Sequence, residues 1–122
     1  TADAEVVAVD GVFLAMRRAL FDRIAFDPGT FPRFHFYDLD IAMQVRRHAR
    51  CVVTCGIPIK HFSAGKFDGE WQDAAAAFRA KYAGQLPAAC VPGAPDPDPS
   101  KRELAENHDI TDKAGTGVYV GK

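Results

Sequence analysis

A proline-rich stretch divides the chain and limits which part of it can form a packed core. Residues 86–100, LPAACVPGAPDPDPS, hold most of the eight prolines in the 122-residue sequence. Proline has no backbone N–H to donate and its ring fixes φ, so this stretch can neither continue a helix nor join the interior of a sheet. We expect a linker or wrapping arm here, which confines the core to residues 1–85.

The segment that follows the prolines, KRELAENHDITDKAGTGVYVGK, offers few residues for a core. Ser100 followed by Glu103 has the spacing of a capping box and predicts a short helix over residues 100–107. The rest is polar and contains glycine. Residues 86–122 are therefore expected to form a linker and a mostly irregular tail.

Composition excludes several classes of protein. With 48% hydrophobic and 25% charged residues, the chain is typical of a soluble globular protein, and its length suits one domain. A formal net charge of −1 supplies no overall basic field for nucleic acid, although RRHAR at 46–50 is locally basic. No apolar run approaches the roughly 20 residues that span a bilayer, and the first ten residues lack a signal-peptide pattern. We expect a cytoplasmic protein, or one that partners hold at the inner face of the membrane, with no transmembrane segment and no nucleic-acid partner.

The cysteines indicate reduced thiols. There are three of them, Cys51, Cys55 and Cys90, and no two are spaced as Cys-x-x-Cys. An odd number without that spacing fits small buried side chains better than a disulfide framework or a zinc site.

Residues 1–85 predict strands and helices in alternation, and therefore an α/β fold with a small mixed sheet packed by helices. β-branched and aromatic runs predict the strands, and apolar residues three and four apart predict the helices. In chain order we expect a strand over 4–16 interrupted at Asp10–Gly11, a short helix over 17–24 and an ordered aromatic loop over 26–37. A helix over 39–50, strands over 51–55 and 57–61, and a helix over 68–82 capped by Asp68 are expected to follow.

Three segments carry a resemblance to a known family. VDGVFLAMRRALFDRIAFDPGTF, FHFYDLDIAMQVRR and IPIKH resemble, in order and spacing, the second half of the catalytic domain of family 2 nucleotide-sugar glycosyltransferases, which have the GT-A fold. The resemblance covers about residues 5–82. The matching positions are Asp10–Gly11, Arg17–Arg18, Phe26–Asp27, Asp38-x-Asp40, Arg46 and His61, and Tyr37 stands where the family usually has Glu. The resemblance implies a partial GT-A-like fold that lacks the N-terminal nucleotide-binding half.

The resemblance also implies a division of chemical roles. Sugar transfer requires a base for the acceptor hydroxyl and compensation of charge on the departing diphosphate. Asp38 matches the family's general base, and His61 matches a ligand of a divalent metal, Mn²⁺ or Mg²⁺, expected in the full-length enzyme. The residues expected to bind substrate are Asp10, Gly11, His35, Tyr37, Asp40, Arg46 and Trp71.

Each of these roles has a structural alternative. Asp38 lies where a helix starts, and Asp is a favoured N-cap. Asp40 is about 200° further around a helix, so the two acids cannot share a face and Asp40 fits a structural role through the helix dipole or an arginine. His61 could be a surface histidine or a hydrogen-bonded histidine of the core, and His35 could form a hydrogen bond within the loop. Trp71 could belong to the hydrophobic core.

The nucleotide-binding half with its Asp-x-Asp metal motif has no counterpart in the sequence. The other Asp-x-Asp, Asp96 with Asp98, lies among prolines that make a poor metal cradle. No initiator Met precedes Thr1, so we expect a piece of a longer chain that is inactive alone and needs its N-terminal half, a nucleotide-sugar donor and a saccharide acceptor. The alternative is a non-catalytic binding or assembly module that self-associates through an exposed sheet edge.

Overall fold

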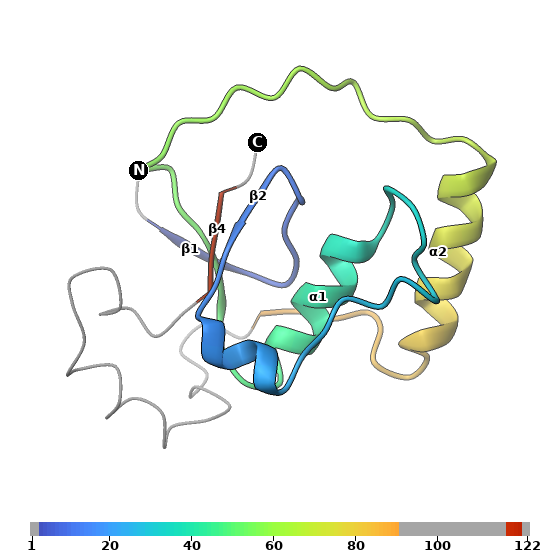
Figure 1. Ribbon diagram of the computed structural model, residues 1–122, viewed down its shortest axis with the longest axis horizontal. Coiled ribbons are helices and arrows are strands. Elements are labelled where there is room, and N and C mark those ends of the chain that lie inside the picture. Colours follow the sequence, from blue (N-terminus) through green and yellow to red (C-terminus); the bar gives the residue numbers. More distant parts are fainter. Residues whose placement is uncertain (1–2, 91–116, 121–122) are drawn as a thin grey trace.

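Within the residues that the structure describes, the chain forms a four-stranded sheet and two α-helices (Figure 1). The computed structural model describes residues 3–90 and 117–120. The elements, in chain order, are β1 (Ala4–Val6), β2 (Phe13–Ala15), the 3-10 helix η1 (Arg18–Asp22), α1 (Tyr37–Val45), β3 (Cys51–Val53), α2 (Gly69–Lys81) and β4 (Gly117–Val120). The predicted mixed α/β class is confirmed.

The sheet joins strands that are far apart in the sequence. Its order is β1-β3-β4-β2, with β1 antiparallel to β3, β2 antiparallel to β4, and β3 parallel to β4. Strand β4 comes from the tail that was expected to be mostly irregular, and GVYV has the β-branched and aromatic residues that favour a strand. The Pro-rich residues 91–100 and the helix predicted over 100–107 lie outside the described residues.

The local elements differ from expectation mainly in length. Helix α2 confirms the predicted helix, and the Asp68 Oδ1 accepts a hydrogen bond from the Trp71 N–H at 3.2 Å. Helix α1 begins two residues earlier than expected and ends at Val45, and the expected helix over 17–24 is the 3-10 helix η1. The strand expected over 4–16 is two three-residue strands.

The strand predicted over 57–61 is wrong. Residues 54–67 form neither helix nor strand, and they run as an extended arc from β3 to α2 (Figure 1). Pro58 has no N–H for a sheet ladder, and Ile57 is 49% exposed, so neither hydrogen bonding nor burial favours a strand here. We call residues 54–67 the arc.

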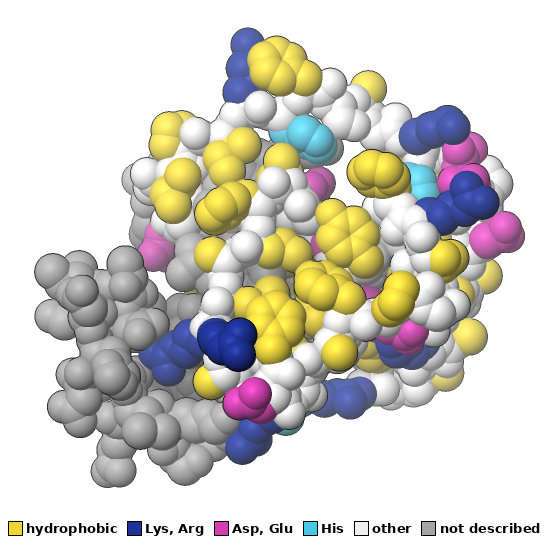
Figure 2. Space-filling view, in the orientation of Figure 1, with side chains coloured by type: hydrophobic (Ala, Val, Ile, Leu, Met, Phe, Trp, Pro, Cys, Tyr) yellow, Lys and Arg dark blue, Asp and Glu magenta, His cyan; other side chains and the backbone are white. Residues whose placement is uncertain are grey.

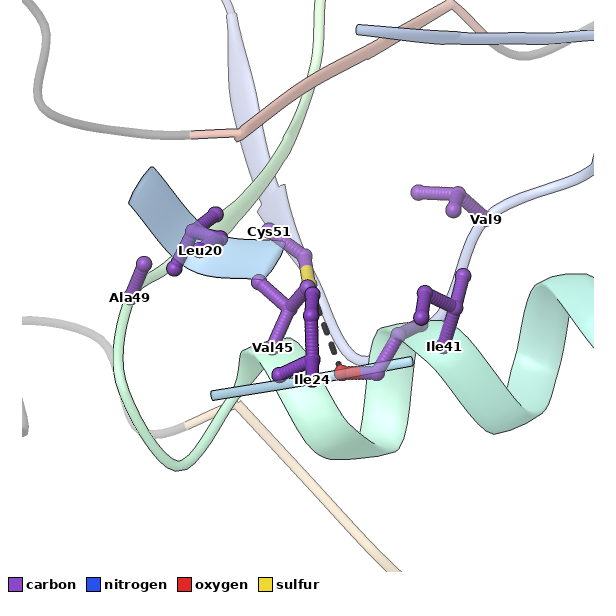
Figure 3. Close-up of a cluster of buried hydrophobic side chains, with 8 residues drawn as sticks. Val9, Leu20, Ile24, Ile41, Val45, Ala49 and Cys51 are labelled. Carbon is purple, nitrogen blue, oxygen red and sulfur yellow. Dashed lines mark hydrogen bonds between the residues drawn. The ribbon is translucent and has the colours of Figure 1, made fainter. Parts of the chain in front are cut away.

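Helix α1 lies at the centre of the packing. One cluster of buried side chains joins it to the sheet and to η1, as Figure 3 shows: Val9, Leu20, Ile24, Ile41, Ala42, Val45, Ala49 and Cys51. A second cluster joins α1 to α2 through Phe31, Met43, Phe78 and Tyr82. The cysteines are free, as expected, but only Cys51 is buried, and its thiol donates to the Ala42 carbonyl at 3.7 Å; Cys55 is exposed.

A buried carboxylate connects α1 to the end of α2. Asp40 is 1% exposed, and its oxygens accept hydrogen bonds from the Tyr82 hydroxyl at 2.7 Å and the Gln44 amide at 2.9 Å. The Lys81 ammonium lies 2.8 Å from Asp40 and 2.7 Å from Asp27. A charge can remain in a core when it is paired and hydrogen-bonded in this way.

These contacts change the acidities of the groups involved. Burial, followed by the hydrogen bond to Asp40, raises the pKa of the Tyr82 hydroxyl. Burial acts to lower the pKa of Lys81, but its hydrogen bonds with Asp27 and Asp40 outweigh burial and raise it. The same Lys81 hydrogen bond, followed by that of Thr30, lowers the pKa of Asp27.

Asp40→Asn is expected to reduce the free energy of unfolding by about 3 kcal/mol. The change removes one of the two carboxylates that pair with the partly buried Lys81 ammonium, and it replaces an acceptor of the Tyr82 hydroxyl with an amide. Urea unfolding of the 122-residue chain, followed by circular dichroism, measures this change. Asp73→Asn on the exposed face of α2 is the matched control and should change stability by less than about 0.5 kcal/mol. Equal losses in the two variants would contradict a special role for Asp40.

Stability should also fall in alkaline solution. Tyr82 and Lys81 have higher pKa values in the folded chain than in the unfolded one. Above about pH 10 the unfolded chain therefore loses these protons first, which lowers the free energy of unfolding. Tyr82→Phe should lower stability at pH 7 by about 1 kcal/mol and make the loss between pH 9 and pH 11 shallower. Urea unfolding across this range tests the prediction, and an unchanged pH dependence in Tyr82→Phe would refute it.

Candidate functional site

An open cleft of about 860 Å³ lies beneath the arc. Its walls are the turn after Val9, the segment that leads into α1, the arc, and the start of α2. Figure 2 shows the surface hollowed below the arc, with histidine and acidic side chains at the margin. The cleft brings together seven of the residues predicted from the sequence: Asp10, Gly11, His35, Tyr37, Asp38, His61 and Trp71.

Asp38 anchors two backbone groups at the cleft wall. Its Oδ2 accepts the Gly11 N–H at 2.8 Å, and its Oδ1 accepts the Leu39 N–H at 2.8 Å. The N-cap position itself is held by Phe36, with φ 66° and no side-chain cap. Asp38 therefore satisfies one of the free N–H groups of the first turn from inside the helix, and its carboxylate still borders the cleft.

Gly11 is held from both sides by neighbouring residues of α1. While Asp38 binds its N–H, the Tyr37 hydroxyl donates to its carbonyl at 3.3 Å. A Cβ at position 11 would overlap the Tyr37 hydroxyl and ring, so only glycine allows this approach. Burial, followed by the negative charges of Asp38 and Asp10, raises the pKa of Tyr37, which keeps the hydroxyl protonated as a donor.

Aromatic rings line the opposite side of the cleft. Trp71 contacts Phe36 at 5.4 Å and Phe67 at 5.2 Å between ring centroids, and Phe36 continues to Phe78 in the core at 5.5 Å. Phe34, also in the wall, is 88% exposed, and Phe67 is 72% exposed. Phe34 and Phe67 are not among the residues predicted from the sequence, although the four-residue spacing of Phe67 and Trp71 is a signal that points to Phe67.

Two predicted substrate-binding residues lie elsewhere. The cleft lining includes neither Asp40, which is buried against Tyr82 and Lys81, nor Arg46. Arg46 follows the C-terminal end of α1, and its Nη2 donates to the Ala89 carbonyl at 2.9 Å. Both side chains have structural partners, and the alternative role given to Asp40, that of a structural acid, is the one that the fold supports, with lysine in place of the expected arginine.

His61 reaches the cleft without a metal-binding set around it. Within residues 3–90 and 117–120, no three His, Cys, Asp or Glu side chains come close enough to hold a metal ion. The described residues therefore do not fit a complete metal site. His61 alone would be one ligand of an ion held mainly by groups from outside this part of the chain.

No family model, curated protein or solved structure matches this chain. Of the helices described here, none is both long and apolar enough to cross a membrane.

Gly11→Ala is expected to displace Tyr37 and to reduce the free energy of unfolding by about 1 to 3 kcal/mol, because the new methyl group overlaps the ring. In a Tyr37→Leu background the same change should cost at least about 0.5 kcal/mol less, as a double-mutant cycle would show. Gly69→Ala is the control, since a Cβ there meets nothing within 4 Å. Additive losses for positions 11 and 37 would contradict the close approach.

Proposed function

We propose that the cleft is the acceptor side of a nucleotide-sugar glycosyltransferase and that Asp38 is its general base. One observation supports this most directly. Asp10–Gly11, Asp38 and His61, which the family resemblance selects from separate parts of the sequence, line one cleft. Polar groups that converge on one concave site are the usual starting point for an active-site hypothesis.

The contacts of Asp38 suit the role of a base. Two backbone N–H groups fix the carboxylate, and each oxygen keeps acceptor capacity for a hydroxyl group in the cleft. In the proposed reaction, the acceptor oxygen attacks the anomeric carbon while Asp38 takes its proton, and the sugar–phosphate bond breaks with its electron pair leaving on the diphosphate. A base held in place by backbone contacts needs little reorganisation for this step.

The neighbours of Asp38 would position the acceptor. His35 supplies a polar group and Trp71 a flat ring in the same cleft, and Tyr37 holds the Gly11 turn against the base. The donor would be bound chiefly by an N-terminal half of a longer parent chain, together with Mn²⁺ or Mg²⁺. A divalent ion there would neutralise charge on the diphosphate.

Asp38→Asn in the parent enzyme should lower the turnover number by about a hundredfold to ten-thousandfold, the usual contribution of a general base, and leave binding of the sugar nucleotide unchanged. A transferase assay and donor titration measure the two quantities. Asp73→Asn, an exposed carboxylate on α2, is the control and should keep full turnover. Turnover retained in Asp38→Asn would remove Asp38 as the base.

A further inference from the structure

We propose that the acceptor is an oligosaccharide whose chain leaves the cleft along a row of aromatic rings formed by Tyr37, Phe26 and Phe21, the aromatic row. This inference rests on the proposed function, because it extends the acceptor site beyond the sugar that reacts. It assigns a ligand to a part of the surface that the reaction itself does not use.

The aromatic row is continuous with the cleft. Tyr37 is both a cleft residue and the first ring of the row, and its centroid lies 6.2 Å from that of Phe26. The Phe26 ring is in turn 6.4 Å from Phe21. The three rings come from α1, from the loop before it and from η1, and Figure 2 shows hydrophobic side chains gathered over η1 and the N-terminal half of α1.

The outer two rings are not needed to anchor their segment. Leu20 and Ile24, from the same stretch, are 6% and 4% exposed and already fix it to the core. Phe21 and Phe26 remain 47% and 46% exposed. These two rings therefore offer apolar surface next to the cleft that a ligand could cover.

The loop that carries Phe26 is held in place before any ligand arrives. The Gln44 side chain accepts the Ala25 N–H at 3.1 Å and donates to the Ala25 carbonyl at 2.9 Å. On the other side of Phe26, Asp27 accepts the Thr30 N–H at 3.0 Å and pairs with Lys81. A prearranged ring loses little conformational entropy on binding, which favours affinity.

The row suits a neutral sugar chain in particular. A flat aromatic ring packs against the C–H face of a pyranose, and neighbouring rings can contact successive units. The acid next to Phe26, Asp27, is paired with Lys81, so this carboxylate does not itself select an ionic ligand. Tyr37 and Asp38 both line the cleft, so in this proposal a sugar presented to the base has its next units over Tyr37 and Phe26, a path that a small acceptor would not use.

The test is titration of the full 122-residue chain with linear oligosaccharides of one to six units, from glucans and from N-acetylglucosamine polymers, by calorimetry. We expect affinity to rise at least about tenfold from monomer to tetramer in one of the series. Phe21→Ala and Phe26→Ala should each reduce that gain about fivefold, in line with the strength of one ring contact, without changing monomer affinity. Phe62→Ala, an 85% exposed ring on the arc outside the row, is the matched control and should keep the gain. Circular dichroism confirms that each variant is folded.

Equal affinity for monomers and longer chains, or a gain that persists in both Phe→Ala variants, would overturn the proposal. Sedimentation tests whether a second copy of the chain, and not a sugar, covers the aromatic row. A wild-type dimer that becomes monomeric in Phe26→Ala, with unchanged sugar binding, would assign the row to a second copy of the chain. The Asp38→Asn turnover assay tests the base and not the row. If Asp38 proves necessary for turnover while sugar affinity does not depend on chain length, this inference is refuted and the proposed function is not.

Discussion

The buried carboxylate of Asp40 is the contact on which the placing of α1 depends. Through Tyr82 and Lys81 it joins the first turns of α1 to the last turn of α2, and Lys81 extends the connection to the loop at Asp27. A buried acid without these partners would be strongly unfavourable, so the two helices are specified as a pair. Because Asp38 is two residues from Asp40, fixing the helix also fixes the candidate base.

Asp38 and Asp40, the two acids of the DLD sequence, have different surroundings because of helix geometry. Two residues correspond to about 200° of rotation, so a helix that buries Asp40 must turn Asp38 toward the opposite side. There the Asp38 carboxylate meets the Gly11 turn, and the Tyr37 hydroxyl binds the same glycine. Side chains of α1 thus hold the turn between β1 and β2 by hydrogen bonds to the Gly11 backbone, so this wall of the cleft depends on a residue without a side chain.

Features that depend on residues within one segment could be predicted from the sequence, whereas features that depend on partners far away in the sequence could not. The α2 helix follows from the spacing of Trp71, Phe78 and Tyr82 and from the Asp68 cap, all within one segment. Strand β4 could not be placed, because its pairing with β3 joins segments more than 60 residues apart in the sequence. The prediction that Arg46 binds substrate has the same origin, since the Ala89 carbonyl that accepts its hydrogen bond lies 43 residues away.

For the site, seven of the nine predicted residues line the cleft, and among them Asp10–Gly11, Asp38 and His61 were implied by the resemblance to glycosyltransferases. The activity implied by that resemblance stays a prediction. The cleft could not be outlined from the sequence because its shape depends on the path of the arc, which has no periodic pattern. Phe34 and Phe67 show this, since their exposure reflects where the chain passes and not a regular element.

The two sides of the cleft differ in how strongly the structure constrains them. The side with Asp38 and Tyr37 is part of a helix packed in two hydrophobic clusters. The arc makes side-chain hydrogen bonds between residues two apart, Gly56 with Thr54 and Gly65 with Ser63, and its Phe62 is 85% exposed. A segment with few buried contacts opens at a low free-energy cost, whereas a packed helix does not. The fold therefore places Asp38, the proposed base, on the more strongly constrained side of the cleft, and the arc forms the less constrained side.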